Sequence, residues 1–371
     1  MALPSFTIGI EEEYQVIDPE TGELTSYIQE FLEQGEIVLG DQIKAELLQS
    51  QVEVGSHICQ NIQEAREEVI RLRSHVCELA ESNGLRVVAA STHPFSSWKT
   101  QEVTDKDRYT DHIEKMAEVA RRMLIFGMHV HIGIEDRDLM MDLMDQARYF
   151  LPHLLALSTS SPFWHGRDTG LKSYRSIVFQ GLPRTGPPPA FSSWSEHQRF
   201  IDILIRTNSI EDATRIWWDI RPHPKFPTLE FRVFDICTKV DEAVCLAACT
   251  LAIVGKLIQL RQQNRSWRRY RHHLITENKW RAVRYGIDGK LIDFGRQEEV
   301  PMRDLIAEFL EIVDDVVDEL GIREEVSYAN TILAEGTSAD RQLAVYRETE
   351  DLKAVVDHLV EETREGLDLI D

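Results

Sequence analysis

The 371-residue sequence contains few cysteines, and their spacing does not suggest a disulfide framework. There are five, an odd number, and none forms a C-x-x-C pair. Cys245 and Cys249 stand four residues apart in an apolar run, as core residues on one face of a helix would. Free thiols are typical of a reducing compartment, so we expect a cytoplasmic protein.

The sequence also lacks the features of a secreted, membrane-spanning or nucleic-acid-binding chain. Its N-terminus has no basic and apolar signal, and no apolar run approaches the roughly 18 to 20 residues that a membrane span needs. Lys and Arg total 41 against 63 Asp and Glu, and the net charge of -22 opposes binding to nucleic acid or anionic membranes. We therefore expect no nucleic acid and no membrane as partners. An anionic substrate would need bound cations or clustered arginines.

Glycine-rich phosphate-binding motifs are absent as well. The sequence has no G-x-x-x-x-G-K-[ST] segment and no G-x-G-x-x-G fingerprint, which argues against a P-loop or dinucleotide-binding fold. If this chain handles phosphates, metal ions would have to take the place of the glycine-rich cradle.

The most regular pattern present is the segment 127–133, in which apolar and imidazole side chains alternate. In a β-strand this alternation puts His129 and His131 on one face and the apolar residues on the other. The flanking Gly127 and Gly133 leave room for something to lie close against the backbone. Taken alone, two such histidines fit a solvated edge strand as well as a binding site.

Three further segments alternate in the same way and carry charged groups on one face. These polar faces hold Glu11 and Glu13 in residues 7–14, Glu53 in residues 51–54, and Glu230 with Arg232 in residues 229–233. Glu12 is the exception, because it falls on the apolar face of its strand. Solvated sheet faces usually mix in Lys, Thr and Ser, so this selection of carboxylate, imidazole and guanidinium groups predicts a site.

Such a face offers hard oxygen ligands with a minority of nitrogen, which suits Mg²⁺ or Mn²⁺ better than Zn²⁺. Several divalent ions on one surface usually serve the phosphates of a nucleotide triphosphate. Arg232, Arg221 and Arg281 could then stabilise charge on the transferred phosphate, because a guanidinium binds phosphate bidentately.

Other segments are expected to surround this sheet. Periodic apolar residues predict helices over residues 59–82, 104–126, 138–157, 192–206, 241–263 and several from residue 301 on, and a hairpin strand is expected near residues 23–27. The stretch 158–191 is irregular and is expected to be a lid or binding loop, with Arg175 and Arg184 either as anion binders or simply exposed. The helix near residues 277–286 is expected to present Asn278 and Arg281 to a phosphate.

Together these residues resemble the glutamate–cysteine ligase type 2 family, in particular its carboxylate–amine ligase branch. The matching stretches are residues 9–13, 127–133, 174–176, 183–191, 217–224, 229–233 and 278–286. The resemblance implies an α+β, glutamine-synthetase-like fold, in which helices pack on the outer face of a curved antiparallel sheet. It implies one catalytic domain over residues 1–371, and residues 300–371 are expected to be a helical C-terminal scaffold.

The resemblance also implies an activity and residue roles. ATP would phosphorylate a substrate carboxylate, classically that of glutamate, and an amine such as that of cysteine would displace phosphate to form an amide. Weak glutamate–cysteine ligase activity is the family expectation, with small-molecule amino acid and amine substrates, ATP and Mg²⁺ or Mn²⁺ as cofactors, and a homodimer. The implied metal ligands are Glu11, Glu13, Glu53, His129, His131 and Glu230; Glu53, Arg175 and Arg232 would be catalytic, and Arg184, Arg221, Asn278 and Arg281 would contact nucleotide or substrate.

Two other classes stay open from the sequence. A metal-dependent amidohydrolase can also begin with H-x-H on a strand, although acids precede the pair here and glutamate dominates. A nucleotide-binding regulatory protein without turnover is the second alternative, and its only hint is Glu12, which interrupts the alternation.

Overall fold

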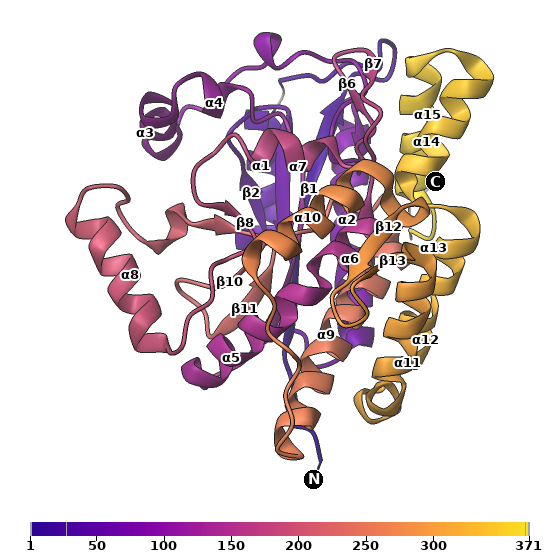
Figure 1. Ribbon diagram of the computed structural model, residues 1–371. Helices are drawn as coiled ribbons and strands as arrows, with labels where there is room; N and C mark the ends of the chain where they lie inside the picture. Colours follow the sequence, from indigo (N-terminus) through magenta and orange to yellow (C-terminus); the bar gives the residue numbers. More distant parts are fainter. Residues whose placement is uncertain (1, 27, 368, 370–371) are drawn as a thin grey trace.

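A seven-stranded antiparallel sheet forms the centre of the computed structural model, which describes residues 2–26, 28–367 and 369 (Figure 1). The strand order is β10-β11-β5-β1-β3-β2, and β4 pairs with the far end of β1. The strands are β1 (Ile8–Ile17), β2 (Ile43–Ala45), β3 (Gln51–Gly55), β4 (Arg86–Val88), β5 (Met128–Gly133), β10 (Ile220–Pro222) and β11 (Thr228–Phe231). The four alternating segments of the sequence therefore become four adjacent strands.

The two faces of the sheet differ as the alternation predicts. On β1, Ile8, Ile10 and Tyr14 are buried in the core, whereas Glu11 and Glu13 are partly exposed on the opposite face. Helices α2 (Ile62–Ser82) and α9 (Val240–Gln262) pack against the sheet and against each other. The predicted α+β class, an antiparallel sheet with helices on its outer face, is confirmed.

Glu12 lies on the core side of β1 and has a structural partner there. Its carboxylate pairs with the guanidinium of Arg73 on α2 and accepts a hydrogen bond from the hydroxyl of Tyr14. Arg73 is fully buried and also donates to the carbonyls of Thr238 and Cys237, which follow β11. This network ties β1 to α2 and to the segment after β11, so the break in alternation is explained by packing.

Helix α9 corrects the expectation that no run is long enough to cross a membrane. Its length and mean hydropathy of 2.0 would allow it to do so, but 89% of its most apolar stretch is buried inside the protein. Besides α2 and the sheet, other helices pack against α9, including α5 (Arg137–Ala147), α6 (Leu151–Ser158) and α11 (Met302–Leu320). The helix is the central packing element of the fold, and Cys245 and Cys249 are fully buried in it as predicted.

One local prediction is wrong, and another is confirmed only in part. The helix expected over residues 104–126 is divided into α3 (Asp107–Met116) and α4 (Glu118–Arg121), because Ala117 between them adopts a left-handed φ of 51°. The spacing of Thr104 and Asp107 resembles a capping box, but the Thr104 hydroxyl donates to the carbonyl of Glu46 and does not cap α3. The expected hairpin strand is reduced to a single bridge between Ile17 and Leu24, and Tyr27 lies outside the described residues.

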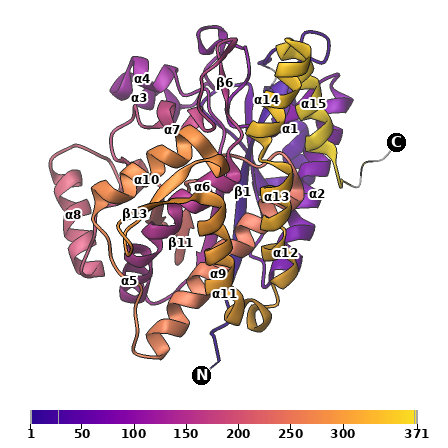
Figure 2. The same cartoon turned by 45° about the vertical axis from the view of Figure 1, so that its right-hand side comes forward.

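The C-terminal helices run along one side of the molecule (Figure 2). Helix α11 packs its apolar side on α9. Helices α12 (Arg323–Ser327) and α13 (Ala329–Glu335) also pack on α9, and α15 (Leu352–Arg364) packs on β4. The apolar side of α11 is therefore used within the chain, and the homodimer expected from the family resemblance stays a prediction.

The remaining elements lie outside the seven-stranded sheet. They are helices α1 (Ile28–Leu39), α7 (Tyr174–Phe179), α8 (Trp194–Arg206), α10 (His272–Tyr285) and α14 (Ser338–Thr349), and the strand pairs β6–β7 (Phe163–Trp164, Arg167–Asp168), β8–β9 (Thr185–Gly186, Trp217–Trp218) and β12–β13 (Lys290–Asp293, Glu298–Pro301). The stretch 158–191, expected as a lid or binding loop, instead folds into several of these short elements, and many of its polar residues are buried.

Candidate active site

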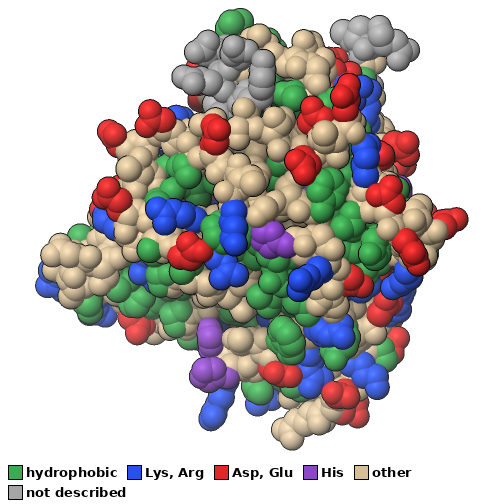
Figure 3. Space-filling view, turned by 90° about the horizontal axis from the view of Figure 1, so that it is seen from above, with side chains coloured by type: hydrophobic (Ala, Val, Ile, Leu, Met, Phe, Trp, Pro, Cys, Tyr) green, Lys and Arg blue, Asp and Glu red, His purple; other side chains and the backbone are tan. Residues whose placement is uncertain are grey.

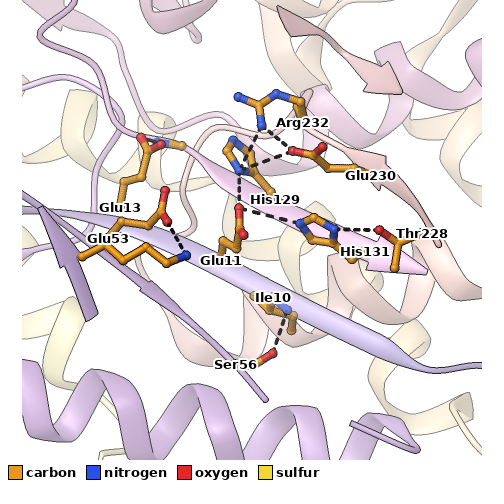
Figure 4. Close-up of polar contacts among 12 residues, drawn as sticks. Ile10, Glu11, Glu13, Glu53, Ser56, His129, His131, Thr228, Glu230 and Arg232 are labelled. Atoms are coloured by element: carbon orange, nitrogen blue, oxygen red, sulfur yellow. Dashed lines mark hydrogen bonds and ion pairs between the residues drawn. The ribbon is translucent and has the colours of Figure 1, made fainter. Parts of the chain in front are cut away.

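The polar face of the sheet carries its charged side chains in directly opposed pairs. In the strand register Glu11 lies opposite His129, Glu230 opposite His131, and Glu13 opposite Glu53. Side chains opposed across antiparallel strands are close enough to interact. These six residues, all predicted from the sequence, form a continuous surface over β11, β5, β1 and β3, which we call the carboxylate floor (Figure 4).

One part of the carboxylate floor has the arrangement of a metal site. Ligand atoms of Glu11, His131 and Glu230 lie within 4.8 Å of one another. Nδ1 of His131 lies 3.1 Å from the Thr228 hydroxyl, which fixes the ring, and its Nε2 is buried without a hydrogen-bond partner. A metal-binding imidazole is commonly oriented through its other nitrogen in this way. Two carboxylates and one free imidazole nitrogen therefore fit a divalent cation.

His129 joins the same group from the neighbouring position on β5. Its Nδ1 lies 2.9 Å from a carboxylate oxygen of Glu11 and 3.9 Å from one of Glu230. Burial, and after it the positive charge of Arg232, lowers the pKa of His129 to about 4. The ring is therefore neutral at physiological pH, which is the form that can bind a metal ion.

Glu13 and Glu53 form a second pair with different electrostatics. Burial and the charge of Glu53 raise the pKa of Glu13 to about 7, and burial and the charge of Glu11 raise the pKa of Glu53. Glu13 accepts hydrogen bonds from the Gln51 amide at 3.1 Å and from the Gly127 backbone at 2.7 Å. Two opposed carboxylates whose pKa values are both raised are a place where a cation would bind with advantage.

Glu11 and Glu230 are ionised at any physiological pH. Burial acts to raise the pKa of Glu11, but its hydrogen bond with His129 and the charge of His131 outweigh it and hold the pKa well below its ordinary value. Burial likewise acts to raise the pKa of Glu230. The charges of Arg232 and Arg221 outweigh it and hold the pKa well below its ordinary value. The floor thus combines permanently ionised carboxylates with the more weakly acidic Glu13 and Glu53.

Two arginines predicted to face a phosphate are placed differently by the structure. Arg221 donates to Glu230 from Nε at 2.7 Å and from a terminal nitrogen at 3.3 Å, and its other nitrogen donates to backbone carbonyls. It therefore holds Glu230 in place, and each of its three nitrogens already donates within the protein. Arg232 also pairs with Glu230, but its Nε is buried without a partner and remains able to donate.

Arg175 lies against the end of the His strand. It comes from the start of α7 and is buried, and a Cβ added to Gly127 would lie only 2.5 Å from one of its terminal nitrogens. The space predicted beside Gly127 is therefore filled by a side chain of the protein, as is the space beside Gly133, where Thr7 lies. Nε of Arg175 is buried and unpaired, like that of Arg232. Its alternative interpretation as an exposed loop residue is wrong.

The remaining sequence candidates bind elsewhere. The amide of Asn278 exchanges two hydrogen bonds with the backbone of Ile292, at 2.9 and 2.8 Å, and so fastens β12 to α10. Arg281 pairs with Glu277 and Glu299 near the surface. Arg184, with a left-handed φ of 60°, donates to the carbonyl of Arg215 and lies over Trp217. No hydrogen bond within the described ranges joins these three to the carboxylate floor.

The structure also shows supporting residues that the sequence did not single out. Asp235 accepts hydrogen bonds from the backbone of Ser160 and from the hydroxyls of Ser161 and Ser173, and the Ser161 hydroxyl accepts from the backbone of Arg175. Asp235 and the three serines are all buried. The only sequence signal was the concentration of serine in the stretch 158–176, which resembles any loop.

A second supporting pair joins α10 to the sheet edge. Lys279 contacts both carboxylate oxygens of Asp219, at 2.6 and 2.8 Å, and both residues are buried. The carbonyl of Asp219 in turn accepts a hydrogen bond from the backbone of Arg232 at 2.7 Å. On the helix that was expected to present Asn278 and Arg281 to a phosphate, Lys279 is thus the residue that pairs with the sheet edge.

A pocket of about 840 Å³ opens beside the candidate metal site of Glu11, His131 and Glu230. Its wall includes Glu11 and His131 together with apolar residues, of which Ile58 and Phe226 are 76% and 57% exposed. Figure 3 shows a different face, the one that looks upward in Figure 1. Lys and Arg side chains, with histidine among them, lie in its middle, and many acidic side chains lie toward the rim.

Comparisons with known proteins agree with this geometry. A family model described as glutamate–cysteine ligase family 2 matches residues 7–358. Curated proteins provisionally named glutamate–cysteine ligase 2 are similar over almost the whole chain. The protein of Herpetosiphon aurantiacus is 58% identical over 364 residues, covering 98% of this chain and 94% of its own, and that of Roseiflexus sp. (strain RS-1) is 57% identical over 362 residues, covering 98% and 96%.

Solved structures show the same fold at low sequence identity. The glutamate–cysteine ligase of Francisella tularensis, in complex with AMP, aligns with a TM-score of 0.73 and 12% identity over 98% of this chain and 90% of that one. A bifunctional glutathione synthetase from Pasteurella multocida aligns with a TM-score of 0.70 and 14% identity over 98% of this chain and 53% of that one.

Proposed function

The chain belongs to glutamate–cysteine ligase family 2, and from this premise we propose that it is an ATP-dependent carboxylate–amine ligase. Its substrates would be a small carboxylic acid, such as an amino acid, and an amine, with weak activity on glutamate and cysteine. The observation that carries the proposal is the metal-binding geometry of Glu11, His131 and Glu230 beside a pocket large enough for a nucleotide.

The proposed reaction has two steps. A carboxylate oxygen of the acid attacks the terminal phosphorus of ATP and ADP leaves, which gives an acyl phosphate. The amine nitrogen then attacks the acyl carbon, phosphate leaves, the amine loses a proton, and an amide bond remains. Mg²⁺ or Mn²⁺, when bound, would neutralise the ATP phosphates and orient the terminal phosphoryl group.

The residues of the floor take separate roles in this proposal. Glu11, His131 and Glu230 would hold one ion, with His129 in reach of the same carboxylates, while Glu13 and Glu53 would hold a second. Arg221 positions Glu230 through two hydrogen bonds. The unpaired Nε atoms of Arg175 and Arg232 would donate to the transferred phosphoryl group, for which guanidinium is well suited.

The pocket would take the nucleoside part of ATP. It touches the floor at Glu11 and His131, so a nucleotide with its phosphates on the floor would place its base among the apolar residues. Phe226 is exposed there and stacks with His223, with ring centroids 4.7 Å apart and planes at 9°. An exposed aromatic face of this kind can stack on a purine.

An ADP-release screen tests the proposal. The protein is incubated with ATP, Mg²⁺ and sets of acids and amines, and any amide product is identified by mass. We expect ADP only when Mg²⁺, an acid and an amine are all present. Amide cleavage without nucleotide would instead indicate a hydrolase, and nucleotide binding without turnover would indicate a regulatory protein.

A pair of variants links the activity to the floor. Glu230→Gln should abolish ADP release and keep the fold, because it removes a metal ligand. Glu298→Gln, a change at an exposed position of β13, should leave the rate unchanged. Wild-type rates in Glu230→Gln would contradict the proposal.

A further inference from the structure

Lys44 on β2 extends the carboxylate floor by one strand. In the sheet register Lys44 lies opposite Glu53, which itself lies opposite Glu13. Its ammonium group is 3.2 Å from a carboxylate oxygen of Glu53, and the charges of both Glu53 and Glu11 act on it. The lysine is thus the direct counter-ion of a carboxylate proposed to hold a metal ion.

Lys44 is also the only lysine or arginine among the described residues that line the pocket. The wall of the pocket is otherwise apolar, neutral or acidic, and its acidic members are Glu11, Asp41, Glu135 and Asp136. The side chain of Lys44 is 51% exposed, whereas that of Glu53 is 12% exposed. Lys44 can therefore leave its partner without any change in the core.

The position of Lys44 allows two roles, and the side chain can fill only one of them at a time. A divalent cation at Glu53 would compete with the ammonium group for the same oxygen, because like charges repel and the doubly charged ion attracts the carboxylate more strongly. A lysine displaced from Glu53 would lie between the floor and the pocket. The phosphates of a nucleotide bound there would cross this boundary.

We propose that Lys44 is a displaceable counter-ion, which neutralises Glu53 before a metal ion binds and contacts the nucleotide phosphates afterwards. This inference rests on the proposed function for the placement of the nucleotide. It assigns to β2 a part in binding, although the strand contributes no metal ligand.

Binding measurements without turnover test the inference. The full chain and its Lys44→Met variant are titrated with Mn²⁺ alone, followed by the signal of free Mn²⁺ in electron paramagnetic resonance, and with the Mg²⁺ complex of a non-hydrolysable ATP analogue by calorimetry. Lys44→Met should bind Mn²⁺ about tenfold more tightly, because a competing charge is lost. The same variant should bind the nucleotide analogue about tenfold more weakly, because a phosphate contact is lost.

Two controls make the result specific. Lys353→Met removes a lysine that pairs with Asp357 at 2.8 Å on the surface of α15, and it should change neither affinity. Lys44→Arg keeps the positive charge and should restore most of the nucleotide affinity. Unfolding by heat is recorded for each variant to show that the fold persists.

The outcomes separate this inference from the proposed function. If the wild type binds both probes and Lys44→Met binds them equally well, the role of Lys44 is wrong and the ligase proposal stands. Weaker binding of both probes by Lys44→Met would also overturn the inference, because it would mean that Lys44 only supports the floor. A wild type that binds neither probe would overturn both.

Discussion

Individual carboxylates of the floor differ in acidity, and this difference predicts how pH affects metal binding. Glu13 has an ordinary pKa of 4.5 that the folded protein raises to about 7, and that of Glu53 is raised as well. Between these values Glu13 keeps a proton in the folded metal-free protein that it has already lost in the unfolded chain. The contribution of Glu13 to stability should therefore fall as the pH rises from about 4.5 through about 7.

A divalent cation should reverse this loss, because it stabilises the ionised carboxylates. We expect Mg²⁺ to raise the melting temperature more at pH 8, where Glu13 is ionised, than at pH 5.5, where it is mostly protonated. Melting curves with and without Mg²⁺ at the two pH values measure the effect. An equal shift at both values would mean that Glu13 does not take part in binding.

The contact between Gly127 and Arg175 gives a steric prediction. A methyl group on Gly127 would lie 2.5 Å from the guanidinium, so Gly127→Ala must displace Arg175. Misplacing one catalytic group by about 1 Å can cost on the order of a hundredfold in rate, so we expect a loss of at least about tenfold in kcat/KM. The steady-state rate of ADP release measures it.

Gly55→Ala provides the matched control. It is also a glycine of a floor strand, but its added Cβ would lie 3.8 Å from the Glu11 side chain, which is an ordinary contact. We expect near wild-type kinetics for it. Full activity in Gly127→Ala would show that Arg175 does not need its present position.

At the scale of elements, the buried pair of Glu12 and Arg73 holds β1 on α2. Removing one partner of a buried ion pair leaves an uncompensated charge and costs about 3–5 kcal/mol of unfolding free energy. We therefore expect a loss of this size for Arg73→Met, measured by urea denaturation. Lys353→Met, at the surface pair with Asp357, should lie within experimental error. A loss in Arg73→Met as small as that of the control would contradict the structural role of the pair.

The strands that carry the floor were predictable because their signal is local. Each alternation fits within four to eight residues, and a period of two assigns every side chain to a face without knowledge of the neighbours. What the sequence does not reveal is which strands pair and in which register. The opposition of Glu13 and Glu53, through which the charge of Glu53 raises the pKa of Glu13, depends on that register.

The partners of the remaining polar residues were not predictable for the same reason. Asn278 and Arg221 have the chemistry of phosphate ligands, but one binds the backbone of Ile292 and the other binds Glu230 on the next strand. Lys44 lies in a strand of three residues, too short for periodicity to mark it. The division of the helix at Ala117 had no glycine or proline to indicate it.

At the scale of the whole molecule, the C-terminal helices are part of the same packed body. Helix α14 begins beside the serine-rich turn that supports Arg175: the hydroxyl of Thr337 contacts that of Thr159 at 2.8 Å, and the amide of Gln342 donates to the carbonyl of Ser160 at 2.9 Å. These residues are buried. The helices expected as a scaffold thus reach the support of the site.

This continuity predicts that the chain unfolds as one unit. Helices α11, α12 and α13 cover α9, which packs on the sheet, so melting the C-terminal helices would expose the central core. We expect a single calorimetric transition whose van't Hoff and calorimetric enthalpies agree. Two separate transitions would show that residues 300–371 form an independent domain.

The central claim is that the floor gathers glutamates and imidazole from four strands to hold divalent ions under nucleotide phosphates. Anomalous diffraction from crystals grown with Mn²⁺ and a non-hydrolysable ATP analogue tests it most directly. The account predicts a peak at coordination distance, about 2.2 Å, from ligand atoms of Glu11, His131 and Glu230. Bound nucleotide with no anomalous peak on the floor would contradict it.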